Sequence, residues 1–167
     1  MKKNFQIFLL IGLIFVMLPS ALCDCSNNKA RNVAEVSNSR AEIERELRAA
    51  IDTDSLARQY FDCLYRGLAQ DSAHIGAKWF LANVPPQAEK SFQLRWKKIN
   101  ENLKKDGKSL DCSVILIGIL CENVWTEDSV TKAKLAQNAL TAEDVELFLV
   151  SLRDREGNDY FLVNPEY

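Results

Sequence analysis

The N-terminus constrains this chain most, because an apolar run follows two positive charges there. Lys2 and Lys3 precede residues 5–18, which are almost all apolar. These 14 residues are fewer than the ~20 that a membrane-spanning helix needs. Pro19 and Ser20 end the run, and small residues follow. This order of charge, apolar core and small residues is typical of a secretory signal peptide, so we predict an exported protein.

We expect signal peptidase to cleave after Cys23, because Ala21 and Cys23 then occupy the two positions that require small side chains. One alternative is an uncleaved N-terminal membrane anchor. Another is lipidation at Cys23, as in bacterial lipoproteins, although Leu22 differs from the small residue that usually precedes a lipid-bearing cysteine. The predicted location is therefore periplasmic or secreted, with a lipid as the alternative link to a membrane.

Removal of residues 1–23 leaves 144 residues, a natural size for one domain. Residues 24–38 are polar and lack a clear hydrophobic period, so we predict a linker there and a single domain at 39–167. The product would carry 19 basic and 23 acidic residues, a net charge of −4. Such a surface gives no basic footprint for nucleic acid.

Four cysteines remain after this cleavage: Cys25, Cys63, Cys112 and Cys121. An even number in an exported chain predicts two disulfides with three open connectivities, and buried free thiols are the alternative. If Cys112 and Cys121 share one extended strand, roughly 30 Å separates them, which excludes a bridge between these two. The cysteines and the single histidine, His74, have no zinc spacing, so we predict no metal and no cofactor.

The first two thirds of the chain have the pattern of helices. Ser39 and Glu42 fit a capping box, and residues 52–55 interrupt the helical pattern and can cap a second helix. A third helix is expected at 71–82. Pro86 suits the start of a fourth, which would run to about residue 105 with Phe92, Trp96, Ile99 and Leu103 on one face.

The remainder predicts strands. Residues 109–125 are rich in Val, Ile and Leu and indicate a long buried strand, with a bulge at Gly118. Weaker strand character follows at 130–139, and 145–152 alternates. Residues 155–158 fit a hairpin turn before a return strand at 160–163. The expected fold class is therefore α+β, with N-terminal helices packed on a curved antiparallel sheet.

A family resemblance rests on the same segments. Residues 54–64 (DSLARQYFDCL), with Asp71 beyond them, resemble the first helix of NTF2-like (cystatin-like) domains. Residues 146–152 and 159–163 are similar to the last two strands of those domains, so the likeness covers about 52–165. The resemblance implies a cone whose mouth holds a small apolar ligand. Some members of this family are isomerases or dehydratases that use an Asp or His as a base, so the resemblance also implies such an activity as an alternative.

Few residues in the sequence are candidates for catalysis. His74 is suited to proton transfer, and Asp62 or Glu122 could act as a base in apolar surroundings. A structural histidine and solvated surface acids are the alternative interpretations. No nucleophile, phosphate-loop or metalloprotease motif occurs in the sequence, so we assign no catalytic residue.

Aromatic residues supply the ligand-binding candidates. We place Tyr60, Trp79 and Trp96 with His74 as residues that could line a pocket, and Tyr65 and Trp125 belong to the same aromatic set. At these spacings the aromatic side chains are more often plain core. The expected function is a non-catalytic binding or protein-interaction module of the cell envelope or secreted space, with a small apolar ligand or a protein as partner. The alternatives are a small ketosteroid-isomerase-like or dehydratase-like enzyme and an inhibitor or immunity-type protein.

Overall fold

A computed structural model describes residues 24–105, 112–154, 157, 158 and 160 of this chain, with side chains described from residue 39 onward except that of Cys112. The chain divides into two compact units, residues 1–39 and residues 40–167. The buried hydrophobic side chains of the described residues all belong to the second unit.

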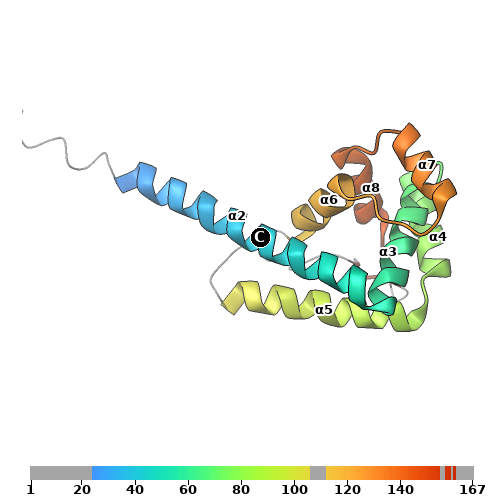
Figure 1. Cartoon of the computed structure of the whole chain (residues 1–167), viewed down its shortest axis with the longest axis horizontal. Helices are drawn as coiled ribbons and strands as arrows, with labels where there is room; N and C mark the ends of the chain where they lie inside the picture. The colour runs from blue at the N-terminus through green and yellow to red at the C-terminus, as the bar shows by residue number, and fades with distance from the viewer. Residues whose placement is uncertain (1–23, 106–111, 155–156, 159, 161–167) are drawn as a thin grey trace, which may run out of the picture. The chain divides into compact units, whose positions relative to one another are not determined.

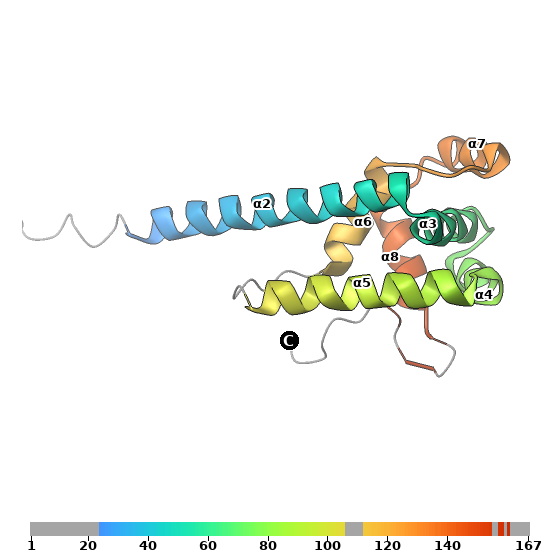
Figure 2. The ribbon, with the colours of Figure 1, turned by 60° about the horizontal axis from the view of Figure 1, so that its bottom comes forward.

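The described regular structure consists of helices (Figure 1). The helices are α2 (Asp24–Thr53), α3 (Ser55–Leu68), α4 (Ala73–Asn83), α5 (Pro86–Lys105), α6 (Cys112–Glu122), α7 (Ser129–Gln137) and α8 (Ala142–Ser151). Helix α3 contacts α4, α5, α7 and α8, and α8 also contacts α4 and α6. Figures 1 and 2 both show α4 beside α3 and α6 beside α8. Helix α3 therefore holds a central place in the second unit.

The predicted helices of the first two thirds are confirmed, with one change at the start. Asp54 caps α3 by accepting hydrogen bonds from the backbone N–H groups of Leu56 (2.9 Å) and Ala57 (3.4 Å). Helix α5 begins at Pro86 as predicted. Helix α2, however, begins at Asp24, so Ser39 lies inside a helix rather than at its start. The backbone of residues 24–38, which we predicted to form a linker, is helical as well.

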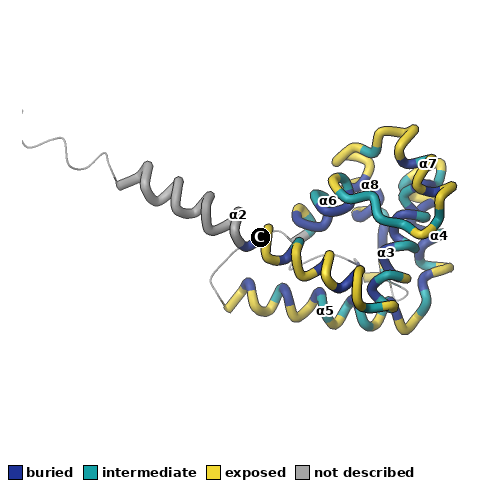
Figure 3. The backbone as a smooth tube through the Cα atoms, viewed as in Figure 1, coloured by how far each residue is buried: buried dark blue, intermediate teal, exposed yellow. Residues whose placement is uncertain are grey.

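The core is built around aromatic side chains from several helices. Tyr60 stacks on Phe92 with ring centroids 3.9 Å apart, and Phe92 stacks on Trp96 at 5.7 Å. Phe80 meets Tyr60 edge to face at 5.5 Å. The buried face predicted for α5 is confirmed, because Phe92, Trp96 and the two aliphatic residues after them are all buried. Figure 3 shows α3 with buried and half-buried residues along most of its length and α7 largely exposed.

The predicted strand at 109–125 is wrong where the structure describes it, because Cys112–Glu122 forms α6. Its buried residues are Ile115, Leu116, Ile119 and Leu120, which recur at helical spacing. A helix that is apolar nearly all round shows no amphipathic period, so its sequence looks like a buried strand. Gly118, predicted as a bulge, lies inside this helix.

The two later strand predictions are also wrong. The segment at 130–139 falls in α7, which Asp128 caps by accepting from the Val130 N–H at 3.1 Å. The segment at 145–152 falls in α8, which begins with a capping box between Thr141 and Asp144. The buried residues there are Val145, Phe148, Leu149 and Leu152, which follow a helical rather than an alternating pattern.

The fold class therefore needs correction from α+β to helical, since residues 24–105 and 112–154 contain no strand. The curved sheet and the NTF2-like (cystatin-like) cone over 52–165 are contradicted by the same finding. A turn does occur at the predicted hairpin position, where the Gly157 N–H donates to the Asp154 carbonyl at 3.0 Å. Gly157 has a φ of +91°, which suits glycine. The return strand at 160–163 lies outside the described residues, apart from a buried Tyr160.

The membrane question can be addressed only for the described helices. None of them combines the length and the apolar character that crossing a bilayer requires. The predicted signal peptide at residues 1–23, including the lipidation candidate Cys23, lies outside the described residues. Export, cleavage and lipidation therefore stay predictions.

Candidate functional site

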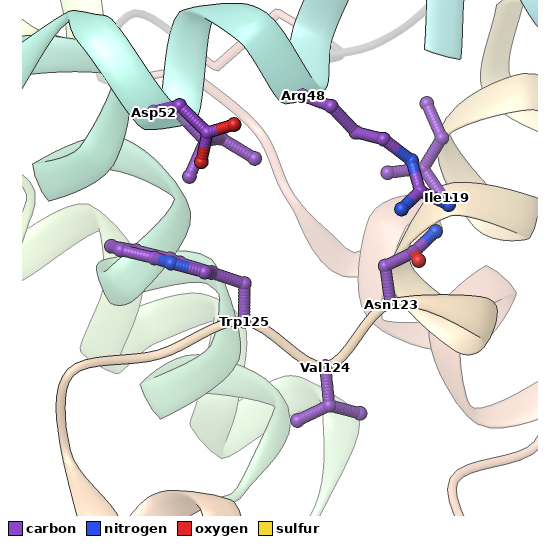
Figure 4. A pocket seen from close by; sticks show the side chains of 7 residues that line it. Arg48, Asp52, Ile119, Asn123, Val124 and Trp125 are labelled. Carbon is purple, nitrogen blue, oxygen red and sulfur yellow. The ribbon is translucent and has the colours of Figure 1, made fainter. Parts of the chain in front are cut away.

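A pocket of about 270 Å³ lies where the ends of two helices meet the loop that follows the second one (Figure 4). The pocket is lined by Arg48, Ile51 and Asp52 of α2, by Ile119 of α6, and by Asn123, Val124 and Trp125 of the α6–α7 loop. All of these residues belong to the second compact unit. The lining thus combines an aliphatic floor, one indole ring, one amide and two opposite charges.

The first wall is the last turn and a half of α2. Arg48 and Asp52 are four residues apart, so they share one face of the helix. Just beyond the helix end, Arg58 donates to the backbone carbonyls of Ile51 (3.1 Å) and Asp52 (2.8 Å). These carbonyls have no partner within the helix, and Arg58 satisfies them. The end of α2 is therefore held in place by α3.

The second wall is the loop at 123–128, which is held down at both of its ends. The Tyr65 hydroxyl donates to the backbone carbonyl of Asn123. Further along, Asp62 accepts from the Thr126 hydroxyl at 2.6 Å and from the Glu127 N–H at 3.1 Å. Asp62 is itself paired with Arg66 at 2.7 Å. Val124 and Trp125 lie between these anchors, so the loop wall is fixed by α3 as well.

At the polar end of the pocket, Glu44 accepts hydrogen bonds from two of the lining residues. Its Oε1 accepts from Arg48 Nε at 3.0 Å and Nη2 at 2.5 Å, and from Asn123 Nδ2 at 3.4 Å. The hydrogen bond from Arg48 contributes most to lowering the pKa of Glu44 below its usual value. Through Glu44, the two polar lining residues Arg48 and Asn123 are tied to one another across the helix–loop junction.

Charge at the other end of the pocket is less compensated. Figure 4 shows the Asp52 carboxylate on one side of the Trp125 ring, away from Arg48 and Asn123. Among the described residues, no cationic side chain pairs with this carboxylate. Asp52 also lies at the C-terminal end of α2, where the helix dipole places partial negative charge. The Asp52 end of the pocket is therefore an electronegative position next to an aromatic ring.

The ligand-binding candidates from the sequence do not form this pocket. Tyr60 and Trp96 are buried in the aromatic core, where they stack on Phe92. His74 is exposed near the start of α4, and Trp79 of the same helix is half-buried. The residues that we named as possible bases lie in ion pairs, Asp62 with Arg66 and Glu122 with Arg40 at 3.0 Å.

The cysteines are described only in part. Cys63 of α3 and Cys121 of α6 carry free thiols, and desolvation raises the pKa of each thiol. These two candidates are therefore not bridged in this structure. The side chains of Cys25 and Cys112 lie outside the described residues, so a bridge between those two stays a prediction. A bridge between Cys112 and Cys121 is excluded for a new reason, because nine residues along α6 separate their Cα atoms by roughly 13 Å.

Sequence reasoning had found only one residue of this site. Trp125 belonged to the predicted aromatic set, but Asp52 was interpreted only as part of a helix break, and Arg48 and Asn123 attracted no interpretation. A usable signal was present, since Arg48 and Asp52 have the i, i+4 spacing of one helix face and the second of them lies at the helix end. The pairing of that face with the loop at 123–125 depends on tertiary structure.

The comparisons with known proteins give no relative from which a role could be transferred. The chain matches no protein-family model, no curated protein and no solved structure. The site must therefore be interpreted from its own geometry.

Proposed function

We propose that this chain is an exported, non-catalytic binding module that contacts its partner through the pocket between α2, α6 and the loop at 123–128. The observation that carries the proposal is the fixed geometry of both pocket walls. Arg58 holds the end of α2, while Tyr65 and Asp62 hold the loop. A pocket that is formed before its ligand arrives loses less conformational entropy on binding, which is the usual basis of affinity at a small site.

The chemistry of the lining favours binding over turnover. The charged groups at one end, Glu44 and Arg48, are paired with each other, and the remaining side chains are aliphatic, aromatic or amide, apart from Asp52. The enzyme alternative depended on an apolar cone with an internal base, and the helical fold removes that support. A contact with a protein partner or a small ligand fits both the exported location that we predict and the open pocket.

The proposal can be tested with partner capture from the native exported fraction. We would compare the full chain with Trp125→Ser, which removes the indole from the pocket, and with Leu94→Ser, which removes an exposed apolar side chain of α5. The species retained by the wild-type chain and by Leu94→Ser should be lost with Trp125→Ser at a temperature where thermal denaturation shows that all three chains are folded. Equal retention by all three chains would contradict a role for the pocket.

Export is tested separately by the mass of the chain recovered from its host. Cleavage after Cys23 predicts a product that begins at Asp24, whereas lipidation predicts a product that begins at Cys23 and carries the mass of acyl chains. Recovery of the uncleaved chain from the cytosol would refute the exported location while leaving the pocket proposal open.

A further inference from the structure

We infer that the pocket binds the side chain of a lysine or arginine of a partner polypeptide, with its cationic group between the Asp52 carboxylate and the Trp125 indole. The inference rests on the proposed function, since it names the chemistry that the same pocket recognises. Three properties of the site carry it: its electrostatics, its apolar lining and its size.

The electrostatics favour a cation at the Asp52 end. Of the charged groups around the pocket, Glu44 compensates Arg48, and Glu127 lies 3.7 Å from Arg58. Asp52 is left with a net negative charge at this end. The C-terminal end of α2 adds partial negative charge in the same place, and a cation near a helix C-terminus is stabilised. Arg58 compensates part of this charge, so the Asp52 carboxylate is the main attraction for a cation. The chain already places one cation of its own, Arg58, on the carbonyls of α2.

The lining suits an alkyl stem that ends in a charge. Ile51 and Ile119 are buried, and Val124 and Trp125 are half-buried and pack against the core. Long basic side chains place their methylene groups along such apolar surface and keep the charged group at a polar end. The face of an indole ring attracts a cation that lies over it. Asp52, on one side of the Trp125 ring, would complete that end of the site (Figure 4).

The size of the pocket limits the occupant. Its volume of about 270 Å³ lies below the roughly 300–1,000 Å³ that is usual for pockets of drug-sized ligands. One long side chain fits such a volume. The Arg48 and Asp52 rim is exposed, so a free amine would bury little surface. A side chain carried by a polypeptide gains additional contacts around the rim, which is why we assign the cation to a protein partner.

The test uses the full chain and observes the Trp125 indole N–H by nuclear magnetic resonance. The probes are N-acetyl-lysinamide and N-acetyl-argininamide, with N-acetyl-norleucinamide and N-acetyl-citrullinamide as neutral analogues of similar shape. Butylammonium serves as the free cation, and tripeptides with a central lysine present the same cation in a chain. The Trp125 signal is assigned by its loss in Trp125→Phe.

We expect both cationic probes to shift the Trp125 signal with affinities about five- to thirtyfold higher than those of their neutral analogues, as one exposed ion pair and one cation–π contact imply. Asp52→Asn should lower this preference by up to about fivefold, because it removes the ion pair and leaves the cation–π contact with Trp125. Glu46→Gln removes the same charge from an exposed position of the same helix and should preserve the preference. Added salt should weaken the cationic probes alone.

Each result separates the inference from the function beneath it. Neutral analogues that bind at Trp125 as tightly as the cations would refute the cation and leave the binding pocket standing. A cation preference that is undiminished in Asp52→Asn would refute the assigned position. Butylammonium binding more than tenfold tighter than the lysine tripeptide would refute the polypeptide source. If no probe of either kind shifts Trp125, both the inference and the pocket function fail.

Discussion

The aromatic core and the pocket both depend on large aromatic side chains, but different forces hold those side chains in place. In the core, Tyr60, Phe92 and Trp96 are buried and stack on one another. In the pocket, Trp125 is half-buried on a loop whose position depends on hydrogen bonds to Tyr65 and Asp62. The first arrangement is stabilised by excluding water and the second by satisfying polar groups.

Because of this difference, we expect the aromatic core to determine the stability of the unit and the pocket to determine its binding. Substitutions in the core should change the free energy of unfolding by several kcal/mol, because cavities form there. Substitutions around the pocket should change it little and should instead alter binding or the order of the loop. Single substitutions in each region can test this separation, beginning with the largest expected effect.

Phe92→Ala should be the most damaging change. Phe92 lies between Tyr60 and Trp96 in the stack, so its loss opens a cavity that the surrounding helices cannot close. The expected cost is about 3–5 kcal/mol of unfolding free energy, measured by urea denaturation. Leu94→Ala, two residues along and exposed, should stay within about 0.5 kcal/mol of the wild type. Similar midpoints for both variants would show that the stack is not the core of the unit.

Two glycines give the next test, because each lies inside a helix with a different neighbour. A Cβ on Gly76 would lie 2.2 Å from the backbone oxygen of Gly67, so α3 and α4 would have to separate. We expect Gly76→Ala to cost about 1–3 kcal/mol. A Cβ on Gly118 would meet Arg40 Nη2 at 2.4 Å, the end of a flexible side chain that can move away.

Gly118→Ala should therefore be close to neutral. It weakens the exposed ion pair of Arg40 with Glu122, which is worth at most about 1 kcal/mol, and it gains a similar amount in helix propensity. Thermal denaturation of the two variants should separate them clearly. A loss at Gly118 as large as that at Gly76 would indicate that the Arg40 contact contributes far more than a surface ion pair.

The same contrast explains which parts of the fold the sequence could predict. Helices α3 and α5 are amphipathic and carry local end signals, Asp54 before one and Pro86 at the start of the other. Their period and their ends could be predicted from neighbouring residues. Helix α6 is apolar on nearly every side, so its sequence shows no helical period of apolar and polar residues. Its β-branched Val and Ile residues instead favoured the prediction of a strand.

The segment that forms helix α8 was predicted to be a strand for a different reason. Its capping box, Thr141 with Asp144, was readable in the sequence, and so was the helical spacing of its buried residues. The alternation of Val145, Leu147 and Leu149 over a few residues masked both signals, although Leu147 is in fact exposed. The candidate site was less predictable still, because it joins Asp52 to Trp125 across more than seventy residues.

Tyr65→Phe tests the anchor of the pocket wall. The substitution keeps the buried ring and removes only the hydroxyl that donates to the Asn123 carbonyl. We expect a loss of about 1 kcal/mol of stability, together with faster hydrogen exchange of the Asn123 amide, which donates to the Ile119 carbonyl at 3.0 Å. Ser151→Ala removes a hydroxyl that bonds within α8 and should leave that exchange rate unchanged. Unaltered exchange in Tyr65→Phe would show that the loop is held by Asp62 alone.

The smallest effect concerns the titration of Glu44. Arg48 holds the pKa of this carboxyl below its usual value, so the folded state binds the proton less readily than the unfolded state. The stability from this pair is present above the unfolded pKa of about 4.3 and is lost as the pH falls through the lower folded pKa. For an i, i+4 pair with partly exposed partners it amounts to about 0.3–0.5 kcal/mol. In Arg48→Gln, the pKa of Glu44 measured by nuclear magnetic resonance should move upward toward its usual value. Arg45→Gln removes an exposed charge from the same helix and should leave the pKa of Glu44 low. An equal pKa of Glu44 in both variants would mean that its carboxylate is stabilised by Asn123 rather than by Arg48.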